Sequence, residues 1–155
     1  MCDTASSGPI AQLEIAALIA AASGPGADVE AIAGRMSVLA TRLSTAGLTA
    51  VAVDAEQAAV DLLRAAGAPR TALDDHLVRL AGRIHARAAQ LVGAGRTREA
   101  VVEGREALAA YRDIALTGLE VDHLAVARER ANLERMFEAR GLSLAGAAPS
   151  PSPGR

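Results

Sequence analysis

The stretch Leu91-Val-Gly-Ala-Gly-Arg-Thr-Arg-Glu-Ala-Val101 has a partial copy 48 residues earlier, in Leu43-Ser-Thr-Ala-Gly-Leu-Thr-Ala-Val-Ala-Val53. Both contain a leucine, an Ala-Gly pair, a threonine two residues after the glycine and an Ala-Val pair. Glycine is favoured just past the end of a helix, where the backbone turns left-handed, and threonine is favoured where the next helix begins. Each copy therefore predicts a break between two helices, and the pair predicts an internal repeat.

Three aspartates, Asp28, Asp75 and Asp122, are spaced by 47 residues, and a glycine follows each of them after about twenty residues. A carboxylate in the first turn and a glycine past the end are typical limits of a helix. We therefore expect the first helices of three units, which cover about residues 28–70, 71–118 and 119–144. Second helices are expected to run to about Ala66 and Gly118, and the predicted helix-capping threonines are Thr49, Thr71 and Thr97.

The two ends of the chain complete the predicted organisation. The segment from Pro9 to Ala22 predicts one more helix, because proline is accepted in a first turn and a Ser-Gly-Pro-Gly turn follows. This gives about six helices in a single domain over residues 9–144. Residues 1–8 are expected to be a flexible N-terminus, and residues 145–155, rich in Ala, Pro, Ser and Gly, a disordered tail.

Composition supports an all-α domain. Of 155 residues, 38 are alanine and 1% are aromatic, which favours helices over sheets. Apolar residues at helical spacing form one stripe, which must face another helix: Leu73, Leu77, Leu80, Ile84, Ala88 and Leu91. Glycines within the helical patterns predict close approach of helix backbones, at Gly34, Gly82, Gly93 and Gly104.

Charge and cysteine usage exclude several classes of function. A net charge of −2 gives no basic excess for nucleic acid. The apolar run 10–22 is too short for a membrane span and contains Glu14. A single cysteine, Cys2, favours the cytoplasm, and the absence of lysine is typical of a GC-rich bacterial genome. We therefore expect a cytoplasmic bacterial protein that binds neither nucleic acid nor membrane.

Motifs for catalysis or metal binding are not found. The sequence has no phosphate-binding loop, Gly-x-Ser-x-Gly elbow or His-Glu-x-x-His pair. The pairs Asp75-His76 and Asp122-His123 consist of adjacent residues, which point about 100° apart on a helix and cannot clasp one ion alone. We therefore expect no enzyme activity, no cofactor and no metal.

The repeat resembles the tetratricopeptide (TPR) family, in which small residues let two antiparallel helices pack closely. The matching positions in the second unit are Ala88, Leu91, Gly95, Glu99, Ala100 and Ala107, and those in the first are Ala40, Leu43, Gly47, Ala52 and Ala59. The likeness covers about residues 28–141. It departs from the family in its period of about 47 rather than 34 residues, and in that the family's usual aromatic residues are largely replaced.

The resemblance implies a right-handed αα-hairpin solenoid whose first helices line a groove for a peptide or helix of a partner protein. A plain helical bundle is the alternative fold. By position, the groove residues would be Ser37, Thr41 and Ser44 in the first unit, His85 in the second, and Arg128, Asn132 and Arg135 in the last. The three last-named could bind a carboxylate or backbone, although they also fit a charged helix that caps the array.

Other interpretations remain open. Arg79, Arg83 and Arg87 form a basic flank on one helix, which fits an acidic partner or, more simply, a solvated surface. Because so short an array must cover its ends, self-association is a further expectation. The alternative function is a helical-bundle sensor that encloses a small apolar ligand between its many small residues.

Overall fold

A computed structural model describes residues 4–116 and 122–145. Within these residues the chain forms six α-helices and no strand, so the all-α prediction is confirmed. The helices are α1 (Thr4–Ala22), α2 (Val29–Thr45), α3 (Thr49–Ala65), α4 (Arg70–Gly93), α5 (Thr97–Leu116) and α6 (His123–Glu138).

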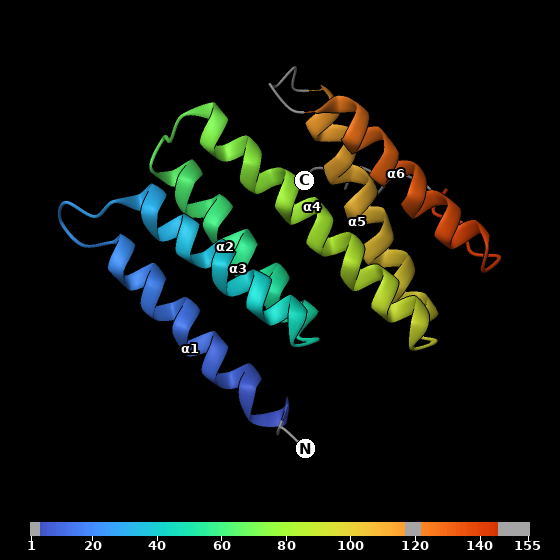
Figure 1. Ribbon diagram of the computed structural model, residues 1–155, viewed down its shortest axis with the longest axis horizontal. Helices are drawn as coiled ribbons and strands as arrows, with labels where there is room; N and C mark the ends of the chain where they lie inside the picture. The colour runs from blue at the N-terminus through green and yellow to red at the C-terminus, as the bar shows by residue number, and fades with distance from the viewer. Residues whose placement is uncertain (1–3, 117–121, 146–155) are drawn as a thin grey trace, which may run out of the picture.

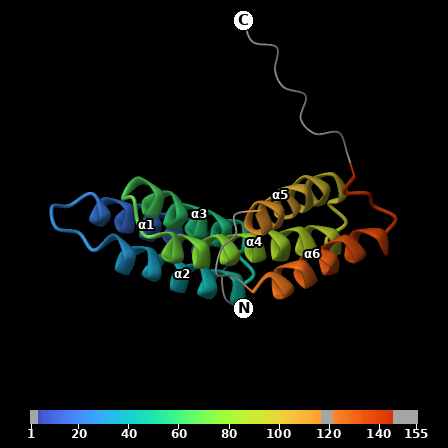
Figure 2. The same ribbon diagram turned by 90° about the horizontal axis from the view of Figure 1, so that it is seen from above.

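The helices form two layers. Figure 1 shows them side by side with alternating direction, and Figure 2 shows α1, α3 and α5 in one layer and α2, α4 and α6 in the other. The closest packing is between α2 and α3 and between α4 and α5, the two helix pairs that the sequence repeat predicts. Helix α4 also contacts α2, α3 and α6, so it connects the two halves of the described structure.

Glycines end the helices as predicted. Gly47 has a φ of 79° and Gly95 a φ of 73°, in the left-handed region that glycine adopts without strain. The Gly47 N–H donates to the Ser44 carbonyl over 3.0 Å, and the next N–H, of Leu48, donates to the Leu43 carbonyl over 2.9 Å. The same two bonds recur at Gly95 and Arg96, so both helices end in the same hydrogen-bonded motif.

The helix starts agree with prediction only in part. Asp28 and Asp122 cap α2 and α6, where their side chains accept the N–H of Ala31 and Ala125 over 3.0 Å each. Asp75 caps nothing, because α4 begins at Arg70, directly after Pro69. The fixed φ of that proline starts the helix five residues before the aspartate.

The predicted threonine caps at Thr49 and Thr71 are wrong. Leu48 is the N-cap of α3 and makes no side-chain cap, so Thr49 is already the first helical residue. Thr71 likewise lies inside α4, after Arg70. Thr97 is the first residue of α5, and its hydroxyl donates a hydrogen bond to the Gly95 carbonyl over 3.4 Å.

The ends of the chain also differ from prediction. Helix α1 begins at Thr4, ahead of Pro9, so residues 4–8 are helical. Helix α3 ends at Ala65, within one residue of the prediction. The predicted end of the second unit at residue 118 and most of the predicted tail, residues 146–155, lie outside the described residues.

No helix in the described part of the chain is both long enough and apolar enough to span a membrane.

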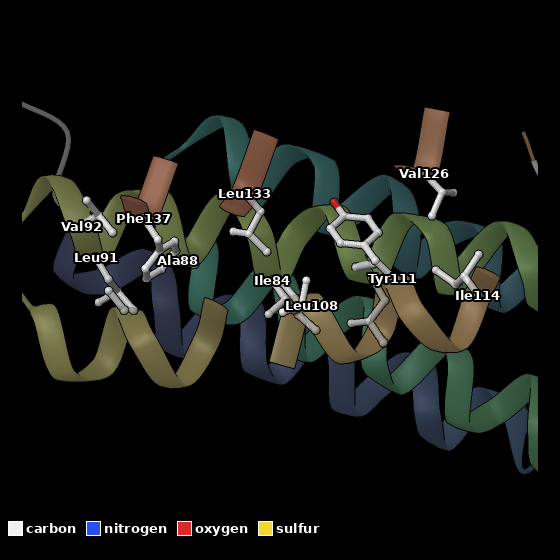
Figure 3. Packing of buried hydrophobic residues seen from close by; sticks show 14 of the residues in the cluster. Ile84, Ala88, Leu91, Val92, Leu108, Tyr111, Ile114, Val126, Leu133 and Phe137 are labelled. Atoms are coloured by element: carbon white, nitrogen blue, oxygen red, sulfur yellow. The ribbon is translucent and has the colours of Figure 1, made fainter. Parts of the chain in front are cut away.

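Small residues permit close packing within each helix pair. The predicted small positions are fully buried: Ala40, Ala52, Ala59, Ala88, Ala100 and Ala107. Figure 3 shows the buried core that α4, α5 and α6 share, in which labelled side chains of all three helices meet. Four of the six residues of the predicted apolar stripe, from Leu80 to Leu91, are buried there, and Leu73 and Leu77 pack against it.

Of the glycines predicted to allow close packing, Gly104 alone does so. A Cβ at Gly104 would lie 2.6 Å from Cζ of Phe137, the fully buried aromatic residue of α6. A Cβ at Gly34, Gly82 or Gly93 would meet nothing within 4 Å. The prediction is therefore wrong for these three positions, which face open space.

Candidate functional site

A pocket of about 490 Å³ lies between α4 and α6, over α5. We call it the α4–α6 pocket. Its lining residues are Asp75, Val78, Arg79, Gly82 and His85 from α4, Tyr111 from α5, and Asp122, Ala125, Val126 and Glu129 from α6. Gly82 adds to the space because it has no side chain to fill it.

Tyr111 and His85 make a paired aromatic contact in this pocket. Their rings meet edge to face with centroids 6.2 Å apart, and the His85 Nδ1 lies 3.3 Å from the Tyr111 hydroxyl. Burial, assisted by the negative charge of Glu129, raises the pKa of Tyr111 to about 12. Burial lowers the pKa of His85, although Glu129 acts in the opposite direction. Both side chains are therefore neutral near pH 7.

Charged groups surround this neutral pair. Asp75, Asp122 and Glu129 contribute three carboxylates, and Arg79 contributes one guanidinium. Arg79 lies within 4.0 Å of none of the described carboxylates, so it does not neutralise them by direct pairing. Glu129 Oε1 forms a loose, exposed ion pair with Arg128 Nε over 3.9 Å, and Arg128 is not itself one of the lining residues. The pocket walls therefore carry an excess of negative charge.

The predicted residues of the last helix are not among the lining residues of this pocket. Arg135 Nη2 donates to Asn132 Oδ1 over 2.5 Å, so these two side chains are engaged with each other. Arg128, with 71% of its side chain exposed, neighbours the lining residue Glu129. Among the predicted groove residues, His85 alone lines the pocket.

The predicted groove residues of the first unit belong to a polar network that is buried at Ser37, half-buried at Ser44 and exposed at Thr41. Arg83 Nη2 donates to Thr41 Oγ1 over 2.9 Å and to the Ser37 carbonyl over 3.2 Å, and Arg83 Nη1 donates to Ser44 Oγ over 3.2 Å. Arg83 Nε donates to Glu56 Oε2 over 2.9 Å. These hydroxyl groups therefore hold Arg83 in place.

Glu56, at the centre of this network, is fully buried. Its Oε1 accepts the Ser37 hydroxyl and lies 2.8 Å from His76 Nδ1. Burial alone would raise the pKa of Glu56, but the hydrogen bonds from His76, Ser37 and Arg83 outweigh burial and hold it below its ordinary value. The carboxylate is therefore ionised and ties α3 to both α2 and α4.

A serine, a histidine and a glutamate in contact invite comparison with a hydrolase triad. In such a triad the histidine uses one ring nitrogen for the nucleophile and the other for the carboxylate. Here Ser37 and Glu56 both meet Nδ1 of His76, at 3.1 and 2.8 Å. All three residues are at most 7% exposed, which leaves no access for a substrate. This arrangement fits a structural role, in which the three side chains hold α2, α3 and α4 together.

Sequence reasoning missed this network. A usable signal was present, because Glu56 continues the stripe of Ala52, Val60 and Leu63, all of them buried in α3. A carboxylate on a buried stripe requires a partner. The two other members of the predicted basic flank differ: Arg87 pairs with Glu103 over 3.2 Å, and Arg79 lines the pocket.

The paired aspartate and histidine motifs occupy different environments. His76 is buried in the network, whereas His123 is exposed at the start of α6. In the described part of the chain, no three His, Cys, Asp or Glu side chains converge in a way that could hold a metal ion. No protein-family model, curated protein or solved structure matches this chain.

Proposed function

We propose that the chain is a non-catalytic protein-interaction module, built as a short TPR-like right-handed solenoid, and that the α4–α6 pocket receives a peptide segment or helix of a partner protein. The two-layer order of the helices supports the solenoid. The buried alanines inside each hairpin support the TPR-like packing.

One observation carries the proposal: the α4–α6 pocket is lined by two helices of the same layer, with a third helix beneath. Its volume of about 490 Å³ lies within the usual range for ligand pockets, roughly 300–1,000 Å³. The apolar base of Val78, Val126 and Tyr111 offers burial to a side chain, and the charged walls offer orientation. The same charges disfavour the alternative, a small apolar ligand.

The test is selection of short random peptides on the immobilised protein, followed by affinity measurement on two variants. Gly82→Leu fills the pocket, and Gly93→Leu adds the same side chain to the same helix at a site facing open space, roughly 16 Å further along the axis. We expect selected peptides to bind wild type and Gly93→Leu alike, and Gly82→Leu at least about tenfold more weakly.

Two results would contradict the proposal. One is a failure of selection to enrich any peptide on the wild-type protein. The other is equal binding of the enriched peptides to wild type and Gly82→Leu. Circular dichroism of both leucine variants verifies that each retains its helices.

A further inference from the structure

We propose that the α4–α6 pocket takes an arginine side chain of the partner peptide. This inference rests on the proposed function and adds the chemistry of the anchoring residue. It follows from the charge of the pocket walls, the spacing of the carboxylates and the apolar surface between them.

Charge complementarity selects a cation. The carboxylates come from two helices, Asp75 from α4 and Asp122 and Glu129 from α6. Arg79 is the opposing charge among the lining residues, and burial keeps His85 neutral near pH 7. An anionic partner group would face three carboxylates, whereas a cationic group gains from each of them.

The direction of Glu129 strengthens this argument. Glu129 lines the same pocket as Tyr111 and His85, and its negative charge acts to raise the pKa of both. At the other wall, Asp122 Oδ1 accepts the Ala125 N–H and so partly offsets the positive end of α6.

The carboxylates are too dispersed for a metal ion, because in the described residues no three potential ligands converge. A guanidinium has five N–H donors in a planar fork and can reach carboxylates that stand apart. The aliphatic stem of arginine can pack along Val78 and Val126. Lysine offers one compact charge and bonds fewer separate acceptors, so arginine fits better.

The experiment begins with the sequences of the selected peptides. We expect an arginine at a fixed position in them, and its replacement by citrulline, which keeps the shape and removes the charge, should weaken binding at least about tenfold. Glu129→Gln should lower the affinity for the arginine peptide several-fold and leave the affinity for the citrulline peptide unchanged. The control is Glu138→Gln, an exposed glutamate of the same helix outside this pocket, which should leave both affinities unchanged.

The outcomes separate the two proposals. Peptides that bind at the pocket without any cationic residue, or that tolerate citrulline, would overturn the arginine inference and leave the proposed function standing. A lysine in place of arginine would overturn the choice of guanidinium. Failure to enrich any peptide would overturn the proposed function and the inference with it.

Discussion

At the scale of single residues, Glu56 decides how the two halves of the described structure are joined. A buried carboxylate is costly unless each oxygen is paired. Here Oε1 contacts Ser37 and His76, and Oε2 accepts Arg83. Because Ser37 belongs to α2 and the two basic residues to α4, this one charge links the first helix pair to α4, beside the apolar packing of Val60 in the cluster that contains Leu80.

Glu56→Gln should lower the free energy of unfolding by about 3 kcal/mol, because it leaves Arg83 buried without its counter-charge. Urea denaturation followed by circular dichroism measures the loss. Glu106→Gln, at an exposed position of α5, is the control. A loss below about 1 kcal/mol, the usual range for surface ion pairs, would show that Glu56 does not hold the interface.

Tyr111 permits a direct titration, because it is the one tyrosine of the chain. Its phenol should ionise at about pH 12 in the folded protein rather than near its ordinary value of 10. Since the folded-state pKa is raised, the stability it reflects is fully present below pH 10 and is lost as the pH rises towards 12.

Ultraviolet absorbance of the tyrosinate measures this transition, and circular dichroism follows the helices in the same sample. The protein unfolded in urea should titrate near 10. Ionisation near 10 while the helices remain intact would contradict the buried contact between Tyr111 and His85.

Single residues were the least predictable scale. His85 was assigned to a groove from the family resemblance alone, and it lines the α4–α6 pocket. Ser37, Thr41 and Ser44 were predicted to line a groove. Their sequence positions do not show that Arg83 of α4 donates to the Thr41 and Ser44 hydroxyls and to the Ser37 carbonyl. Such contacts depend on side chains far apart in the sequence.

At the scale of elements, local signals predict most helix ends. Gly47 and Gly95 are needed for their left-handed backbone, a requirement that lies within a few residues. Asp75 misleads because it has the sequence spacing of a cap, whereas Pro69 starts the helix earlier. An aspartate that recurs at a fixed spacing therefore predicts a helix start only where no proline starts the helix earlier.

Replacing Asp122 and Asp75 in turn should distinguish an aspartate that caps a helix from one that only shares the 47-residue spacing. Asp122→Ala should cost about 1 kcal/mol of stability, because it removes the hydrogen bond to the Ala125 N–H. Asp75→Ala, on the exposed second turn of α4, should change stability by no more than about 0.5 kcal/mol. Thermal unfolding of both variants tests this, and equal losses would contradict the assigned caps.

Helix α6 packs on α5 through Gly104. Gly104→Ala should lower the free energy of unfolding by about 1–3 kcal/mol, because the added Cβ would overlap the buried ring of Phe137. Gly34→Ala, where the Cβ meets nothing within 4 Å, should stabilise by about 0.5–1 kcal/mol. Urea denaturation compares them, and a neutral or stabilising Gly104→Ala would contradict the close approach of Phe137.

At the scale of the whole molecule, the α4–α6 pocket could not be predicted from the sequence. It requires the relative placement of α4 and α6, the open space at Gly82 and the Tyr111 side chain that α5 contributes. The order of the helices and the pairing of α2 with α3 and of α4 with α5 could be predicted, because the glycines that end α2 and α4 are local signals. The proposed function therefore rests on the relative placement of helices, which sequence patterns describe least.

The most direct test of the central claim, that the α4–α6 pocket binds a peptide, is nuclear magnetic resonance with selectively labelled aromatic residues. The chain has one tyrosine and one phenylalanine, so Tyr111 reports on the pocket and Phe137 on the neighbouring core. Titration with a selected peptide should shift the Tyr111 ring signals to saturation at the affinity measured independently, and leave those of Phe137 nearly unchanged. Tyr111 signals that stay in place while the peptide binds would contradict the account.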